Sequence, residues 1–157
     1  MRLTAFTDYS LRTLIYLALR PERQVTINDI AGAYGISNNH LMKVVHQLAM
    51  AGDVATMRGQ RGGLRLGRPA AEINVGAVVR RAEPDLHLAA CFGEAECCTI
   101  QADCVLANLL GEALLAFLAV LDRYTLADLV AHPAALGRLL GIQVAELGLP
   151  LVPATPG

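Results

Sequence analysis

Four cysteines lie within a stretch of 14 residues in the second half of the chain: Cys91, Cys97, Cys98 and Cys104. In a reducing cytosol, such a cluster binds metal or takes part in redox chemistry more often than it forms structural disulfides. The C-x2-C pairs of common zinc sites are absent; the spacing is C-x6-C-x5-C through Cys98 or C-x5-C-x6-C through Cys97. This spacing suits an iron-sulfur cluster, which thiolates hold, but zinc, a thiol-disulfide switch and inert cysteines remain open at this point.

We do not expect adjacent Cys97 and Cys98 to ligate one cluster in the same way, so we expect one to be spare, and a fourth ligand is needed. His87 lies four residues before Cys91 and is a candidate for it. The same histidine is the one activating base near a nucleophilic cysteine, and no second group to orient it is evident. We therefore expect a metal or redox site and no enzyme active site.

The composition limits the class of protein. The 157 residues suit one domain, or one small domain with an oligomerisation element. Hydrophobic residues make up 54% and aromatic residues 4%, so the core must be aliphatic, which favours packed helices. The net charge is only -1, but residues 1–70 hold nine basic and four acidic side chains (+5), whereas residues 71–157 hold four and ten (-6). A basic first half predicts contact with a polyanion.

Neither a signal peptide nor a membrane span is expected. The apolar run Leu14 to Leu19 has six residues and closely follows charged ones. The most apolar stretch, Val105 to Leu121, has 17 residues and includes Asn108, short of the roughly 20 clean apolar residues that a bilayer span needs. We expect a cytoplasmic protein without membrane contact.

The first half of the chain has helix-capping and helix-ending residues at the spacing of a helix-turn-helix. We expect a first helix over 8–19, capped by Thr7. Thr26 and Gly35 bracket a second helix over 27–34, and Ser37 caps a third over 38–50. Apolar periodicity assigns the inner face of the third helix, so polar side chains remain for its outer face: Asn38, Asn39, His40, Lys43, and less clearly His46 and Gln47.

Residues 53–67 alternate apolar positions around a glycine-rich tip, which predicts a β-hairpin wing. Arginines beside glycines can enter a minor groove, and a recognition helix reads base edges in the major groove, where Asn pairs with adenine. The alternative is an exposed face and tip that merely contact solvent. The candidate DNA-binding residues are Ser37, Asn38, Asn39, His40, Lys43, Arg58, Gln60 and Arg61.

The remaining segments complete a mainly α fold with a small β wing. We expect a helix over 74–81, a loop over 85–104, a long helix from 102 to about 122, a short helix from 125 and a possible one near 135–140. The expected domains are a winged helix-turn-helix over 1–82, a cluster-binding loop over 83–104, a dimerisation region over 105–131 and a C-terminal tail over 132–157.

Several of these segments together resemble the winged-helix iron-sulfur repressors, over residues 1 to 131. The resemblance is carried by MRLTAFTDYSLR at 1–12, HLMKVVHQL at 40–48, RGQRGGLRL at 58–66, C-x6-C-T-I-x3-C at 91–104, and F-L-x-x-L-D-x-Y-T-L-A-D-L at 117–129. It implies a regulator that holds a [4Fe-4S] or [2Fe-2S] cluster. In this pattern an aliphatic residue stands two positions after the middle cysteine, which selects Cys98 over Cys97.

The resemblance also implies the fourth ligand. In the nitric-oxide-sensing members it is an aspartate of the F-T-D-Y motif, supplied by the partner subunit, which here is Asp8. The cluster-assembly regulators of the family use a histidine three residues after the last cysteine, where this chain has Ala107. The implied ligands are Cys91, Cys98, Cys104 and Asp8. From the residues alone, Asp8 would instead stabilise the positive end of the first helix.

The expected function is a homodimeric repressor that binds a palindromic operator in double-stranded DNA and releases it when nitric oxide attacks the cluster. The wide apolar stripe of the long helix favours pairing of two copies, although other helices of the same chain could cover it. The alternative function is a clusterless winged-helix regulator switched by thiol oxidation or zinc.

Overall fold

The computed structural model describes residues 2–57, 62–89, 92, 100 and 103–143. Helices dominate, with one two-stranded antiparallel sheet. In chain order the elements are α1 (Ala5–Ala18), α2 (Ile27–Tyr34), α3 (Asn38–Met50), β1 (Val54–Met57), β2 (Gly63–Leu66), a 3₁₀ turn (Ala70–Glu72), α4 (Val75–Ala82), α5 (Val105–Asp122), α6 (Leu126–Leu129) and α7 (Pro133–Leu139). The expected fold class, mainly α with a small β wing, is confirmed.

Helix α1 begins earlier than the sequence suggested. Its N-cap is Thr4, whose hydroxyl accepts a hydrogen bond from the backbone N–H of Thr7. Glu83 accepts hydrogen bonds from both the backbone N–H and the hydroxyl of Thr4, so a residue 79 positions away holds the capping residue in place. Thr7 is buried inside the helix, and the expected start after Thr7 was wrong.

The expected helix-turn-helix is confirmed. Thr26 caps α2 in a reciprocal capping box with Asp29, and Ser37 caps α3. Gly35 between the helices has a φ of 65°, a left-handed conformation that glycine adopts without strain. The aliphatic core packs these helices against α1 through fully buried side chains: Leu14, Leu17, Ile30, Leu41 and Val44.

The hairpin is joined firmly to the helices. Val54 pairs with Leu66 and Met57 with Gly63 across the two strands. Val25, which precedes α2, forms an isolated antiparallel bridge with Leu64. A Cβ at Gly63 would lie 3.2 Å from the Val25 carbonyl oxygen, so glycine permits this close approach. The base of the wing therefore has a fixed position relative to the start of α2.

Asp53 is a buried charge that links the helix-turn-helix, the hairpin and α4. Its side chain is completely buried, and its two carboxylate oxygens accept hydrogen bonds from Arg68 and Arg81. Arg68 follows β2, Arg81 lies at the end of α4, and Asp53 itself connects α3 to β1. Because both arginines remain more than a third exposed, the carboxylate is neutralised by groups that keep water contact.

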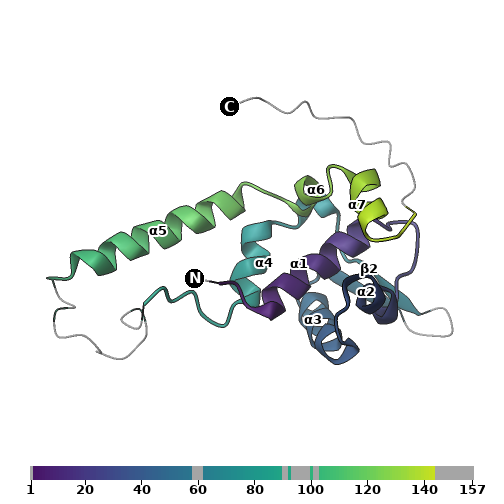
Figure 1. Cartoon of the computed structure of the whole chain (residues 1–157), viewed down its shortest axis with the longest axis horizontal. Helices are drawn as coiled ribbons and strands as arrows, with labels where there is room; N and C mark the ends of the chain where they lie inside the picture. Colours follow the sequence, from purple (N-terminus) through teal and green to yellow (C-terminus); the bar gives the residue numbers. More distant parts are fainter. Residues whose placement is uncertain (1, 58–61, 90–91, 93–99, 101–102, 144–157) are drawn as a thin grey trace.

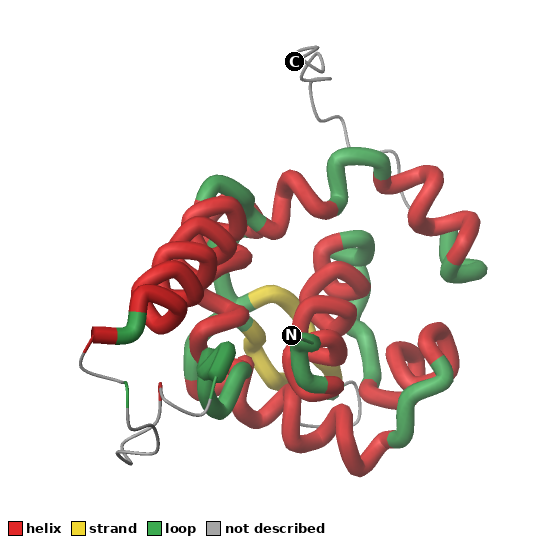
Figure 2. Tube along the Cα trace, turned by 60° about the vertical axis from the view of Figure 1, so that its left-hand side comes forward, coloured by secondary structure: helices red, strands yellow, loops and turns green. Residues whose placement is uncertain are grey.

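Helix α5 runs away from the group formed by α1, α2, α3 and α4 (Figure 1), and a second view again places it to one side (Figure 2). The C-terminal end of α5 is bound to α4, because Arg80 of α4 donates hydrogen bonds to both carboxylate oxygens of Asp122, the last residue of α5, at 2.6 and 2.5 Å. The Arg80 guanidinium lowers the pKa of Asp122. A side chain at Gly76 would collide with the Asp122 carboxylate, so glycine allows the two helices to approach closely.

Helices α6 and α7 return to the core beside α1 (Figure 1). Leu126 and Val130 are buried in it, and Leu136 of α7 packs against it. The short helix expected near residues 135–140 is α7, so residues 132–143 of the tail are structured. Residues 144–157 lie outside the described part of the chain.

Candidate functional site

The outer face of α3 carries the polar side chains expected there. Asn38, Asn39, His40 and Lys43 are exposed, and the Ser37 hydroxyl accepts a hydrogen bond from the backbone N–H of His40 at 3.4 Å. The inner face holds the four apolar side chains expected in the core, Leu41, Val44, Val45 and Leu48, all buried. The outer residues therefore lie outside the buried core, whereas their contact with DNA stays a prediction.

Two of these exposed side chains are held by neighbours on other helices. The Asn38 side-chain amide donates a hydrogen bond to Oδ1 of Asn28, on α2, at 2.7 Å. The His40 ring lies 6.0 Å from the ring of Tyr9, on α1, at an interplanar angle of 33°. Sequence reasoning missed Asn28 and Tyr9, because no periodicity shows which exposed side chains of separate helices meet.

Gln47 is held by the end of α4. Its side-chain amide donates to the backbone carbonyl of Arg81, at the end of α4, at 2.5 Å. Gln47 is half-buried and His46 is exposed, so both lie outside the core stripe, and only His46 is fully open to solvent. The wing residues Arg58, Gln60 and Arg61 lie outside the described residues, although the strands that would present them are in place.

Asp8 lies in the first turn of α1, with 45% of its side chain exposed. Arg12, one turn later, binds its carboxylate, and the Arg12 guanidinium carbon lies 5.5 Å from the centre of the Tyr34 ring. Burial raises the pKa of Tyr34, so this ring stays uncharged beneath the arginine. Asp8 is therefore both near the positive end of a helix, as the alternative interpretation required, and accessible to another subunit.

Of the cysteines, only Cys104 belongs to the described residues. It is the N-cap residue of α5 and is partly buried; within the described part of the chain it forms neither a disulfide nor a side-chain capping bond. Cys91, Cys97 and Cys98 lie outside the described part. Within residues 2–57, 62–89, 92, 100 and 103–143, no three histidine, cysteine or acidic side chains gather as a metal site. A free thiol and an exposed carboxylate are nonetheless donors that fit an iron-sulfur cluster shared between subunits.

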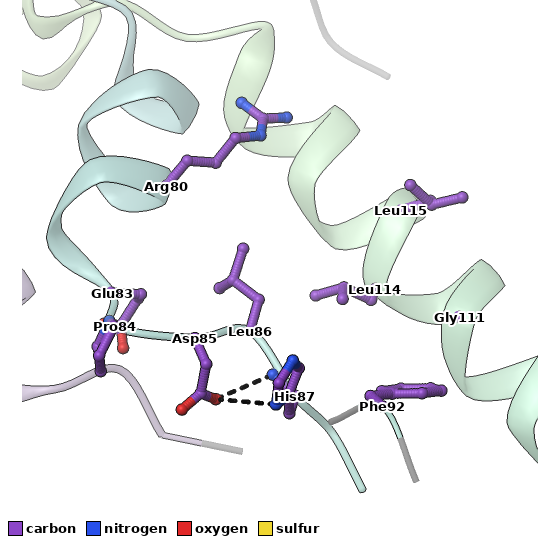
Figure 3. Close-up of a pocket in the computed structure, with 10 residues that line it drawn as sticks. All are labelled: Arg80, Glu83, Pro84, Asp85, Leu86, His87, Phe92, Gly111, Leu114 and Leu115. Atoms are coloured by element: carbon purple, nitrogen blue, oxygen red, sulfur yellow. Dashed lines mark hydrogen bonds and ion pairs between the residues drawn. The ribbon is translucent and has the colours of Figure 1, made fainter. Parts of the chain in front are cut away.

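His87 lines a cavity of about 550 Å³ between the segment that follows α4 and the side of α5 (Figure 3). Its backbone N–H donates to Asp85 at 3.1 Å, and its Nδ1 lies 4.0 Å from the same carboxylate oxygen. Leu86 and Leu114 face each other across the cavity. His87 therefore already has a polar neighbour within its own loop, and no structural feature singles it out as a cluster ligand.

Comparison with family models decides the class of this protein. Residues 3–132 match the Rrf2 model, described as an iron-dependent transcriptional regulator. The chain belongs to the Rrf2 family. This Rrf2 protein is 50% identical over 142 residues to the HTH-type transcriptional regulator NsrR of Bacillus subtilis (strain 168), covering 89% of the chain and 97% of the relative. It is 47% identical over 142 residues to NsrR of Bacillus licheniformis, covering 89% and 99%.

Solved structures agree with this assignment. The Rrf2 chain is similar to T. potens IscR with a TM-score of 0.67 and 26% identity, over 83% of this chain and 86% of the other. It is similar to CymR (YrzC), the global cysteine regulator of B. subtilis, with a TM-score of 0.68 and 26% identity, over 84% and 98%. The family match, the NsrR relatives and these structures together show a winged-helix transcriptional regulator, as the resemblance to that family implied.

Among the described residues, α5 is the one helix whose length and composition would allow it to cross a membrane. Only 6% of Val105–Asp122 is buried. Length and composition therefore do not exclude a span, contrary to the expectation from the 17-residue run.

Proposed function

We propose that this protein is a cytoplasmic repressor that binds a palindromic operator as a homodimer, holds an iron-sulfur cluster and releases DNA in response to nitric oxide. The observation that carries the proposal is the 50% identity to a regulator named NsrR over a segment that spans 89% of the chain. That share is large enough to include the helix-turn-helix, the cysteine segment and α5.

Within this proposal Cys91, Cys98 and Cys104 of one chain hold the cluster together with Asp8 of the partner subunit. The cluster is of the [4Fe-4S] or [2Fe-2S] type, and it supplies iron that nitric oxide can attack. A carboxylate oxygen is a harder ligand than a thiolate and binds such iron less strongly. Asp8 is therefore the most easily displaced ligand, and its position on α1 connects ligand exchange to the DNA-binding head.

Helix α5 supports the homodimer. Leu118 is its one buried residue among the described side chains, and the apolar side chains Val105, Leu106, Leu109, Leu115 and Val120 are between 43% and 77% exposed. Exposed apolar side chains in such number mark an interaction surface. Two α5 helices packed against each other bury this surface and place two DNA-binding heads in a symmetric pair, as a palindrome requires.

The DNA contact is proposed for the outer face of α3 and the tip of the wing. Asn38, Asn39 and Lys43 carry the hydrogen-bonding groups that read base edges in the major groove. Arg58 and Arg61, at the glycine-rich tip, carry the positive charge that attracts phosphates and the minor groove. The charge of +5 on residues 1–70 agrees with a head that faces DNA.

The test is anaerobic purification of the full chain, followed by absorbance and resonance Raman spectroscopy and then by titration with nitric oxide. We expect a brown protein, iron and sulfide in proportion to the cluster, and loss of operator affinity as nitric oxide is added. A colourless protein with bound zinc, or with thiol oxidation that controls DNA binding, would support the clusterless regulator instead. A cluster whose reaction leaves operator affinity unchanged would contradict the proposed signal.

A further inference from the structure

We propose that Asn28 is a positioning residue for DNA recognition: it fixes the orientation of the Asn38 side-chain amide, so that Asn38 presents one N–H and its carbonyl oxygen to a base. This inference rests on the proposed function, because it takes α3 to be the helix that enters the major groove. Asn28 lies on α2, outside that helix, and carries no other assigned role.

The two backbones are held in fixed relative positions. Asn28 is the second residue of α2 and Asn38 the first residue of α3. The two helices pack through side chains that are completely buried, Ile30 on α2 and Leu41 on α3. With both helix starts also capped, only the rotation of the two exposed side chains remains to be restricted. The 2.7 Å hydrogen bond between them restricts that rotation.

The hydrogen bond leaves Asn38 able to read a base. A carboxamide has two N–H groups and one carbonyl oxygen. One N–H of Asn38 points to Asn28, so the second N–H and the oxygen remain. These are the donor and acceptor of the bidentate Asn–adenine pair, which uses the N7 acceptor and the N6 amino group of adenine.

The pair of amides also selects one of two orientations. If the Asn38 amide alone rotated by half a turn, its oxygen would face the oxygen of Asn28, and two acceptors would repel each other. The two amides can therefore turn over only together. In a helix-turn-helix the helix before the recognition helix crosses the DNA backbone. A phosphate placed there would accept from the N–H groups of Asn28 and would keep Oδ1 of Asn28 toward Asn38.

The surroundings of Asn28 agree with a position at the DNA surface. Asn28 lines a groove of about 280 Å³ between the start of α2 and the hairpin, which Thr56 and Gly62 also line. Both asparagines are exposed, so their hydrogen bond adds little to folding stability and can be removed without disturbing the core. Its value lies in reducing the rotational freedom that Asn38 must lose on binding.

The test compares full-length Asn28→Ala, Asn28→Asp, Asn38→Ala and Asn39→Ala. Duplexes are first selected from a random library by the wild-type protein, and affinities are then measured for every single-base-pair change at one salt concentration. Asn28→Ala should lose discrimination, by roughly tenfold, at the same base pair as Asn38→Ala. Asn28→Asp keeps an acceptor for Asn38, so it should retain that preference while its negative charge weakens binding to all duplexes.

A double-mutant comparison completes the test. Asn28→Ala combined with Asn38→Ala should lose no more discrimination than Asn38→Ala alone, whereas its combination with Asn39→Ala should be additive. Unchanged base preference in Asn28→Ala, including a uniform loss of affinity, would overturn the inference, as would unchanged preference in Asn38→Ala. A wild-type protein that selects no sequence would instead contradict the proposed function, and the inference with it.

Discussion

The Nε atom of Arg12 lies 3.0 Å from each of the two carboxylate oxygens of Asp8, one helical turn away. In a single chain, the proposed cluster ligand is thus already engaged by its own helix. An exposed ion pair at this spacing contributes only about 0.3 to 0.5 kcal/mol. Arg12 can therefore hold the Asp8 side chain in place without preventing its transfer to a stronger partner.

Substitutions at these two positions separate the roles of Asp8. Asp8→Ala should leave three cysteine ligands, so that some cluster still assembles with an altered spectrum, while operator affinity falls. Arg12→Ala removes the ion pair and keeps the carboxylate, so it should retain the wild-type spectrum. Anaerobic spectroscopy and DNA affinity are measured on the same samples. A wild-type spectrum with wild-type affinity in Asp8→Ala would leave Asp8 as no more than a favourable charge at the helix N-terminus.

The cysteine assignment predicts a difference between two adjacent residues. Cys91→Ala, Cys98→Ala and Cys104→Ala should give folded, colourless protein that does not repress, whereas Cys97→Ala should keep its cluster. The measurement is iron and sulfide per chain, with circular dichroism as the control for folding. If Cys98→Ala kept the cluster and Cys97→Ala lost it, Cys97 would be the ligand.

The wing arginines should contribute to affinity without much effect on base preference. Arg58→Ala and Arg61→Ala are each expected to reduce the magnitude of the slope of log affinity against log salt by about 0.9 for each phosphate that the arginine neutralised. Lys43→Ala should instead relax discrimination at particular base pairs, by roughly 1 to 3 kcal/mol for each bidentate pair removed. Salt titrations with operator and scrambled duplexes distinguish the two. An unchanged slope in both arginine variants would remove the wing from the interface.

The dimer proposal predicts that one charge on α5 separates the subunits. Leu109 is 57% exposed, and its burial against a second copy should contribute about 2 kcal/mol per subunit. Leu109→Glu should therefore sediment as a monomer at concentrations where the wild type is a dimer. Leu139→Glu is the matched control, because Leu139 is 84% exposed on α7. Dissociation in both variants, or in neither, would count against α5 as the interface.

The capping box of α2 predicts a dependence of stability on pH. Hydrogen bonds from the backbone N–H and hydroxyl of Thr26 hold the pKa of Asp29 below its ordinary value of 3.8. Because the folded pKa is lowered, the stabilisation is complete above 3.8 and is lost as pH falls through the lower value. Asp29→Ala should lower the free energy of unfolding by about 1 kcal/mol at neutral pH. The loss should become progressively smaller in acid.

Denaturant unfolding at a series of pH values checks this prediction. Glu22→Ala is the control, because Glu22 is an exposed acidic residue outside the capping box. A difference between wild type and Asp29→Ala that stayed constant into strong acid would show that the carboxylate charge does not act through the cap.

The parts of the fold that depend on neighbouring residues could be predicted from the sequence. Thr26, Gly35 and Ser37 cap helix ends through residues no more than one helical turn away. As a result, α2 and α3 begin and end where these capping residues indicated. The start of α1 could not be predicted in this way. Thr7 was expected as the cap, whereas the cap is Thr4, which Glu83, far along the chain, holds in place.

The candidate site was predictable in its residue types but not in its contacts. The inner and outer faces of α3 follow from periodicity, whereas the pairing of Asn28 with Asn38 depends on how two helices pack. Asp53 follows a glycine and reads as an ordinary turn residue, yet it is completely buried between two arginines. The three upstream cysteines and the wing tip lie outside the described residues, so their roles stay predictions.

The strict division of α3 into a buried and an exposed face bears on how such a regulator changes its targets during evolution. Substitutions at Asn39 or Lys43 leave the core stripe intact, so new operator preferences can arise with little loss of folding stability. Asn38 is different, because its orientation depends on Asn28. Drift at position 38 is expected to be followed by compensating change at position 28, so the two positions should covary among regulators that recognise different operators.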